Sequence, residues 1–114
     1  MANGPFGSIR VRDGPEGKIQ AELIKFLRYR EWFVKETVGS MYQSGFPDLY
    51  CSHSVWGARW IEVKNPLAYR FTPAQIQDFP KFCAHGAGIW VLTAATEEEY
   101  QKLNRPCNWT HYLF

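Results

Sequence analysis

The sequence predicts an α/β fold in which helices flank a mixed β-sheet. Three observations predict it. The 114 residues suffice for one hydrophobic core and not for two, so a single domain is expected. Hydrophobic residues make up 46% of the chain, which is enough to fill such a core. Segments with helical and strand patterns alternate in the order helix, three strands, helix, strand and a last short helix.

The first regular element predicted is a helix from about Pro15 to Arg30. Proline suits the first helical position, and apolar residues then recur at helical spacing. These are Ile19, Leu23, Phe26 and Leu27. Residues 1–13 carry glycine, proline and two arginines without periodicity. We therefore expect a flexible N-terminal arm over residues 1–13 and one domain over residues 14–114.

Three strand-like segments follow this helix. Trp32–Val38 is rich in residues with high β-propensity and stops at Gly39. Phe46–Cys51 has Pro47 near its start, where a strand needs no ladder hydrogen bond. Ala58–Lys64 mixes apolar residues with charges and ends before an Asn-Pro pair. The last two segments are close enough in sequence to form a hairpin.

A second helix is predicted over residues 72–84. It has a capping threonine, a proline at the first position and Gln75 three residues after the cap. Pro80 is expected to kink or interrupt it. Ile89–Leu92 has the pattern of a buried strand, and residues 96–99 open a last short helix.

Charge and cysteine content restrict the class of protein only loosely. The 13 Lys and Arg against 11 Asp and Glu give a net charge of +2, which neither demands nor excludes a nucleic-acid partner. Cys51, Cys83 and Cys107 are odd in number and never form a CxxC pair. This pattern argues against a disulfide framework or zinc site and favours a reducing setting. No apolar stretch approaches the ~20 residues of a membrane span, so we expect a soluble, cytoplasmic protein.

The residues that carry chemistry lie on the two strands of the predicted hairpin. Alternate residues of a strand point to the same face, so Glu62 and Lys64 project together. Ile61 and Val63 then point into the opposite layer. If the two strands pair as a hairpin, Asp48 lies beside Glu62. The sequence therefore predicts two carboxylates and one lysine at a single place.

Two neighbouring carboxylates repel each other unless a cation neutralises them. Mg²⁺ suits such a pair because it prefers oxygen ligands and keeps several of its waters. A lysine beside the ion can orient an attacking water or stabilise charge on a phosphate. The alternative is that these charges are simply solvated at a strand end, and the Glu-x-Lys spacing alone is common. The preceding Gly-x-Pro-Asp favours the catalytic interpretation.

These motifs resemble those of a known nuclease superfamily. GFPDL at residues 45–49, followed by IEVK at residues 61–64, resembles the PD-(D/E)XK nuclease signature. EGKIQ at residues 16–20, FTPAQ at residues 71–75 and GAGIWVL at residues 86–92 resemble its virus-type replication-repair nuclease (VRR-NUC) branch. The resemblance spans most of the chain. It implies a restriction-endonuclease-like core that cleaves DNA with Mg²⁺ or Mn²⁺, and it makes a viral or phage origin one option.

The resemblance also implies a role for each matching residue. Asp48 and Glu62 correspond to metal ligands, with the backbone carbonyl of Val63 as a third ligand. Lys64 corresponds to the catalytic lysine. Small stand-alone members of this branch are similar to Holliday-junction resolvases and act as homodimers on branched DNA. The implied partners are therefore branched or junction DNA and a second copy of the chain.

Two further site residues have alternative explanations. Glu16 corresponds to a helix-borne acid of the site, but a carboxylate in a first turn also favours the helix dipole. Glu22 is a rival acid on the same helix. Gln75 corresponds to a polar site residue and is equally explained by the capping box. Tyr69 and Arg70 follow the catalytic strand and are the expected DNA contacts.

Two alternative functions remain open. A sequence-specific or mismatch endonuclease would use the same chemistry, although so short a chain leaves little room for a recognition domain. A non-catalytic DNA-binding module on the same fold is the other alternative, and it has no evident need for the three charged residues together.

The apolar C-terminal residues are expected to pack on the core or across a dimer interface; these are Trp109, Tyr112, Leu113 and Phe114.

Overall fold

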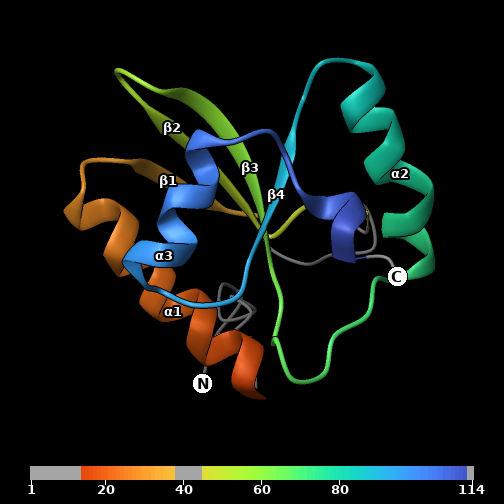
Figure 1. Cartoon of the computed structure of the whole chain (residues 1–114), viewed down its shortest axis with the longest axis horizontal. Coiled ribbons are helices and arrows are strands. Elements are labelled where there is room, and N and C mark those ends of the chain that lie inside the picture. The colour runs from red at the N-terminus through yellow and green to blue at the C-terminus, as the bar shows by residue number, and fades with distance from the viewer. Residues whose placement is uncertain (1–13, 38–44, 113–114) are drawn as a thin grey trace, which may run out of the picture.

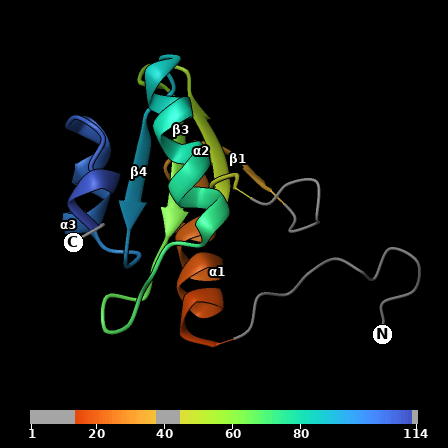
Figure 2. The same cartoon turned by 90° about the vertical axis from the view of Figure 1, so that its right-hand side faces the viewer.

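A four-stranded mixed sheet lies between two groups of helices in the computed structural model, which describes residues 14–37 and 45–112 (Figure 1). The strands stand in the order of the sequence, β1 (Phe33–Glu36), β2 (Leu49–His53), β3 (Gly57–Val63) and β4 (Ile89–Leu92). The pairs β1–β2 and β2–β3 are antiparallel, and β3 pairs with β4 in parallel. Figure 2 shows α2 in front of the sheet when the molecule is turned by 90°.

Helices cover both faces of this sheet. One face packs against α1 (Gly14–Tyr29), α3 (Glu97–Tyr100) and the 3-10 helix η1 (Gln101–Asn104). The other face packs against α2 (Pro73–Ala84) and the 3-10 helix η2 (Trp109–Tyr112). The predicted α/β class, the mixed sheet and the order of elements are therefore confirmed.

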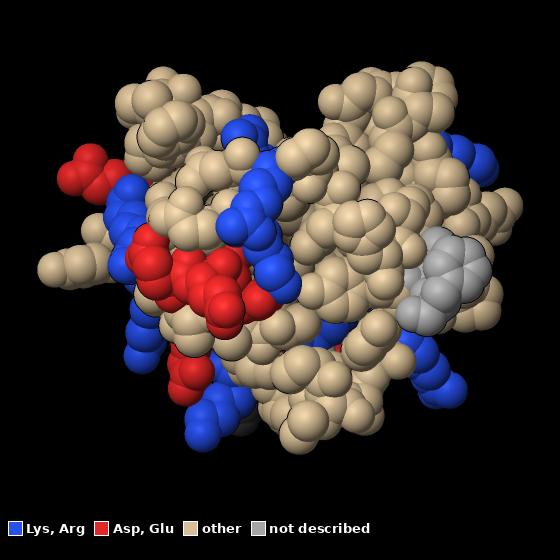
Figure 3. All heavy atoms as spheres, viewed as in Figure 1, with Lys and Arg blue, Asp and Glu red and all other residues tan. Residues whose placement is uncertain are grey.

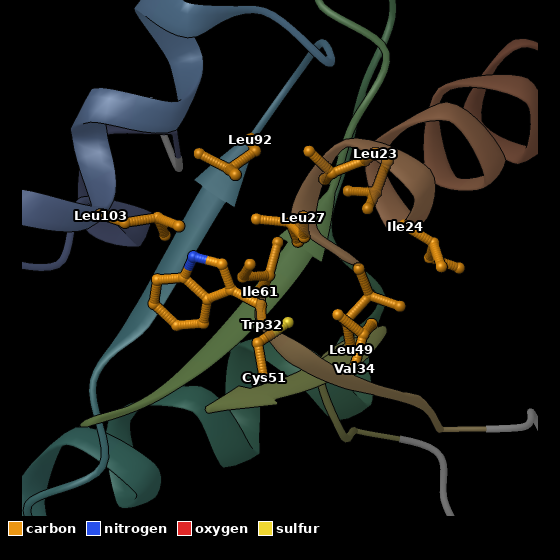
Figure 4. Close-up of a cluster of buried hydrophobic side chains, with 11 residues drawn as sticks. Leu23, Ile24, Leu27, Trp32, Val34, Leu49, Cys51, Ile61, Leu92 and Leu103 are labelled. Atoms are coloured by element: carbon orange, nitrogen blue, oxygen red, sulfur yellow. The ribbon is translucent and has the colours of Figure 1, made fainter. Parts of the chain in front are cut away.

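Each face of the sheet has its own hydrophobic cluster. The larger cluster joins α1 to the inward side chains of all four strands, as Figure 4 shows for Leu27, Ile61 and Leu92. The smaller cluster lies under α2 and is largely aromatic, with Phe71, Phe79 and Trp109 at its centre. The expected packing of Trp109 on the core is thus confirmed, whereas residues 113–114 lie outside the described residues.

The end of α1 explains why β1 is shorter than predicted. The backbone N–H groups of Glu31 and Trp32 donate to the carbonyls of Arg28 and Leu27, which is the Schellman pattern. Glu31 takes the left-handed conformation, with φ 69°, that this motif requires. Trp32 therefore belongs to the helix cap, and β1 begins at Phe33 and not at Trp32.

The predicted start of β2 at Phe46 is wrong, and the strand begins at Leu49. Pro47 has no N–H to give to a ladder. The N–H of Asp48 donates to the side chain of Glu62, 3.2 Å away, and not to a neighbouring strand. The backbone just before Leu49 therefore hydrogen-bonds to the Glu62 side chain instead of extending the strand.

Of the two effects expected of Pro80, a kink or an interruption, the interruption is wrong, because α2 runs unbroken from Pro73 to Ala84. Proline removes only the hydrogen bond to the carbonyl four residues earlier, that of Ile76. Both Pro80 and Ile76 are exposed, so water can satisfy that carbonyl. The predicted capping box at Thr72 and Gln75 is present, with both of its hydrogen bonds.

Two predictions fall on parts of the chain that cannot be described. The expected N-terminal arm of residues 1–13 lies outside the described residues, as does the predicted end of the first strand at residues 38–39. Within residues 14–37 and 45–112, no helix has the length and apolar character needed to cross a membrane.

Candidate active site

Asp48 and Glu62 meet at the end of the β2–β3 hairpin, as predicted. The antiparallel register pairs Leu49 with Ile61, which brings the preceding Asp48 opposite Glu62. The Glu62 carboxylate accepts the N–H of Asp48 at 3.2 Å. In return, the Asp48 carboxylate accepts the N–H of Val63 at 2.8 Å. Each acid is therefore held by the backbone of the other strand.

The turn before Asp48 fixes its approach to β3. Gly45 has φ 94°, a conformation that favours glycine, and a Cβ there would collide with the carboxylate of Asp78. The hydroxyl of Thr37 contacts the carbonyls of Pro47 and Asp48. The glycine of the Gly-x-Pro-Asp motif is thus explained by a close approach to α2.

Glu62 is the most deeply buried charged side chain among the described residues, with 1% of its surface exposed. Its Oε2 atom receives Gln75 Nε2 at 2.8 Å and Lys64 Nζ at 2.9 Å. Burial first and the charge of Asp48 second raise the pKa of this carboxyl to about 8, while Lys64 and Gln75 oppose both effects. Such a perturbed, buried acid beside a second acid is typical of functional sites.

Several neighbouring groups hold the Lys64 side chain in place. Besides the Glu62 carboxylate, its Nζ atom donates to the carbonyl of Arg70 at 2.9 Å. A longer contact of 3.5 Å reaches Gln75 Oε1, and the ring of Phe71 lies 4.7 Å from Nζ. A lysine that is only 4% exposed is rarely placed without partners. Its ammonium group is therefore fixed beside Glu62.

Gln75 serves the helix and the site together. Its Oε1 atom accepts the N–H of Thr72, 3.0 Å away, and so completes the capping box. Its Nε2 atom donates to Glu62, as described above. Gln75 can complete the capping box and contact Glu62 at the same time, because one amide has a donor end and an acceptor end. The N-terminus of α2 is thereby fastened to β3.

Glu16 reaches the same end of β3 from the first turn of α1. Its Oε2 atom accepts the N–H of Asn65, the second residue after the strand, at 3.1 Å. Figures 1 and 2 both place this end of α1 beside the loop that leaves β3. Glu22, the rival acid on α1, is exposed to solvent. The geometry therefore favours Glu16 over Glu22.

The donor atoms at this place fit a divalent, oxygen-seeking ion. Asp48 and Glu62 supply carboxylate oxygens, and the Val63 N–H points toward Asp48. Because the N–H and C=O of one strand residue point the same way, the Val63 carbonyl lies on the side of β3 that faces Asp48. Within the described part of the chain, no three His, Cys, Asp or Glu side chains form a metal cluster. The oxygen donors of Asp48, Glu62 and Val63 suit Mg²⁺ or Mn²⁺, which retain water ligands, better than zinc.

The two residues predicted to bind DNA lie in the exposed loop after β3. Arg70 is exposed, and its carbonyl is the one that accepts Lys64 Nζ. The ring of Tyr69 is 36% exposed and packs against the rings of Phe71 and Tyr112. The exposed Arg70 is therefore joined to the buried lysine through its backbone carbonyl. Its binding to DNA stays a prediction.

Comparison with known proteins bears on the fold. No protein-family model and no curated protein matches this sequence. A solved structure described as a VRR_NUC domain is similar, with a TM-score of 0.65 over 82% of this chain and 98% of that chain. This chain shares the VRR_NUC fold. The predicted restriction-endonuclease-like architecture is confirmed, and because sequence identity to the VRR_NUC domain is 19%, the likeness establishes the fold and not the activity.

Several residues that support the site in this VRR_NUC fold were not predicted. The N–H of Asn65 donates to Glu16, and the ring of Phe71 lies against Lys64. No local pattern predicted either contact. Gln20 is buried one turn after Glu16 and donates to Glu36 at 3.2 Å. Helical spacing from Glu16, and the place of Gln20 in the EGKIQ stretch at residues 16–20, are signals that could have found it.

The other acidic cluster of the molecule has a structural explanation. Figure 3 shows acidic side chains gathered over α3, whose first turn holds Glu97, Glu98 and Glu99. Glu97 pairs with Arg30, and Glu99 pairs with Lys102. The N-terminus of a helix favours such acids, as predicted. This surface is distinct from the Asp48–Glu62 pair.

Proposed function

We propose that this protein is a Mg²⁺- or Mn²⁺-dependent endonuclease that hydrolyses DNA phosphodiester bonds at Asp48, Glu62 and Lys64. The observation that carries the proposal is the buried Glu62 carboxylate, which lies against Asp48 on one side and Lys64 on the other. A purely structural site has no reason to bury an acid beside a second acid, because both like charge and desolvation are unfavourable.

The charge of the site supports a bound cation. When both are ionised, Asp48 and Glu62 carry two negative charges against the single positive charge of Lys64. A DNA phosphate adds another negative charge, so the uncompensated site would repel its substrate. A bound Mg²⁺ or Mn²⁺ supplies positive charge that polarises the phosphate and acidifies a water. Asp48, Glu62 and the Val63 carbonyl are the groups that would hold it.

Each protein group then has a task that its contacts support. Asp48 and Glu62 are pre-oriented by backbone N–H groups, so the ligands need little reorganisation. Lys64 presents an ammonium group beside Glu62, where it can orient the attacking water or stabilise charge on the phosphate. Gln75 acts as a positioning residue for Glu62, and Glu16 fixes the start of the loop after β3.

The preferred substrate is branched DNA, such as a Holliday junction, cut by a homodimer. This part of the proposal rests on the resemblance of the sequence to VRR-NUC domains and on the shared fold. Arg70 and Tyr69, in the loop beside Lys64, would contact the DNA backbone. A DNA substrate also fits the cytoplasmic location expected from the sequence.

A cleavage assay on a panel of labelled DNAs tests the proposal. The full chain is incubated with a four-way junction, a flap and a linear duplex, each with Mg²⁺, Mn²⁺ or EDTA. We expect cleavage that requires metal, is strongest on the branched DNAs and is lost in Lys64→Ala. Lys25→Ala is the matched control, because Lys25 is an exposed lysine on α1, and it should cleave like the wild type.

Each contrary outcome points to a different conclusion. Cleavage that survives EDTA, or that is unchanged in Lys64→Ala, contradicts the mechanism. Equal cutting of linear duplex at defined sequences contradicts the preference for branched DNA and favours a sequence-specific endonuclease. Binding without cleavage in either metal favours a non-catalytic DNA-binding module. The mass in solution decides the dimer independently.

A further inference from the structure

Two cysteines that are far apart in the sequence lie together on the α2 side of the sheet. Cys83 is in the last turn of α2, and Cys107 is in the segment that joins η1 to η2. The Cys107 side chain interacts with the Cys83 thiol and raises its pKa, so the two thiols are neighbours. Trp109 Nε1 donates to the Cys83 sulfur at 3.0 Å. This pair could not be predicted, because neither spacing nor local pattern relates the two residues.

Contacts at the start of β4 also bring the end of α2 close to the segment that holds Cys107. A Cβ placed on Gly88 would lie 3.4 Å from the Cβ of Cys107, and Gly88 directly precedes β4. The backbone of Ile89, the next residue, hydrogen-bonds to the Cys83 thiol. The start of β4 therefore contacts both cysteines.

The third cysteine supplies a natural control. Cys51 is completely buried in β2, within the cluster that packs against α1. Burial raises the pKa of its thiol to about 12, so it stays protonated and unreactive at neutral pH. Cys83 and Cys107 are only half-buried, which leaves them within reach of a small reagent. Burial also raises the pKa of the Cys83 thiol, which slows its reaction without preventing it.

We propose that Cys83 and Cys107 are a modification site at which a low-molecular-weight disulfide forms a reversible intramolecular disulfide bond. Neighbouring thiols have only to close to a bond of about 2.05 Å. The bond ties the segment before η2 to the end of α2. This inference does not depend on the nuclease function.

The reaction is an exchange with an oxidant such as oxidised glutathione. One protein thiolate attacks a glutathione sulfur, the glutathione disulfide breaks, and a glutathione thiolate leaves. The second protein thiolate then attacks the protein sulfur of the mixed disulfide and displaces the other glutathione. The two protein thiols lose two protons and two electrons, and one oxidised glutathione becomes two reduced molecules.

The bond would stabilise the aromatic cluster under α2. Trp109 lies two residues after Cys107, and its ring packs 5.6 Å from that of Phe79 on α2. The closed loop would contain β4 and α3, so the bond restricts a long stretch of the unfolded chain. We therefore expect the oxidised protein to melt at a higher temperature than the reduced protein.

The test treats the full chain with oxidised glutathione and measures its intact mass and melting temperature. We expect a loss of about 2 Da, the mass of two hydrogens. Peptide mapping should show Cys83 linked to Cys107 and Cys51 as a free thiol. The melting temperature should rise by about 10 °C and return to its starting value with dithiothreitol.

Variants separate the disulfide from side effects of the treatment. Cys107→Ser should show neither the mass loss nor the rise in melting temperature, whereas Cys51→Ala should show both. An unchanged mass, a lasting glutathione adduct, a link through Cys51 or a link between chains would each overturn the inference. The readouts require no DNA, so a protein without nuclease activity still tests it.

Discussion

The two faces of β3 are built from alternate residues of one strand, yet they differ completely in character. Ile61 and Val63 are fully buried in the apolar cluster against α1. Glu62 and Lys64 are almost as buried, but on the opposite face and within a polar network. One face holds the fold together, and the other holds charges in place. A single strand therefore carries both the stability and the proposed chemistry.

This difference predicts that stability and activity can be separated by neighbouring substitutions. Loss of apolar volume should lower the free energy of unfolding and leave the geometry of the charges intact. Neutralising Glu62 without changing its shape should lower activity and leave most of the stability intact, because burial and the charge of Asp48 disfavour the ionised form of this carboxyl.

The largest effect is expected on the polar face. Glu62→Gln keeps the size of the side chain but removes the charge that would hold a cation, so cleavage should fall by about a thousand-fold. The rate of cleavage of labelled junction DNA with Mn²⁺ measures it. Glu98→Gln, at an exposed glutamate of α3, is the control and should cleave normally. A fall of less than tenfold in Glu62→Gln would remove Glu62 from the mechanism.

On the apolar face, Ile61→Ala should lower the free energy of unfolding by about 2–4 kcal/mol, because it leaves a cavity in the cluster under α1. Urea denaturation measures this loss. Cleavage by the folded fraction should remain near the wild-type rate at low temperature. A stable Ile61→Ala protein without activity would show that the two faces are not independent.

The pH dependence of stability gives a sharper contrast between the faces. The pKa of Glu62 is raised in the folded protein, to about 8, because of burial and Asp48. A raised folded pKa means that the folded state holds the proton more tightly than the unfolded state. The stabilisation is therefore present below the unfolded pKa, near 4.5, and is lost as pH rises through about 8.

Melting temperatures from pH 4 to 9 in EDTA check this expectation. The metal-free wild type should lose stability over that window, and Mn²⁺ should restore most of it at the alkaline end. Glu62→Gln should lack this loss, because its amide does not titrate. Parallel pH curves for the wild type and Glu62→Gln would mean that Glu62 is ionised throughout.

A smaller effect is expected at the helix that meets the polar face. Gln75→Met removes an N–H donor to Glu62 and an acceptor for Thr72. Cleavage should fall about tenfold, and stability by about 1 kcal/mol, because a site contact and a cap are lost together. Gln77→Met, at an exposed position of the same helix, is the matched control. Equal behaviour of the two variants would make Gln75 a capping residue only.

The sequence was informative where a local period or motif decides the outcome. Strand alternation predicted that Glu62 and Lys64 share a face, and the hairpin spacing predicted that Asp48 lies beside them. The capping box predicted the start of α2. These features depend on residues that are close in the chain, so their patterns survive in the sequence.

Features that depend on distant segments could not be predicted in this way. The contact of Glu16 with Asn65 and the pairing of Cys83 with Cys107 arise only when separate elements pack. The start of β2 was misplaced because the N–H of Asp48 serves the Glu62 side chain instead of a strand. The power of Pro80 to interrupt α2 was overestimated, because an exposed helix surface tolerates the lost hydrogen bond.

Titration calorimetry with Mn²⁺ tests the central claim most directly, because it asks whether Asp48 and Glu62 together hold a cation. The metal-free wild type should bind at least one ion per chain with saturable heat, and Asp48→Asn should lose that binding while melting as a folded protein. Equal binding by Asp48→Asn and the wild type, or no saturable binding by either, would contradict a metal site between β2 and β3.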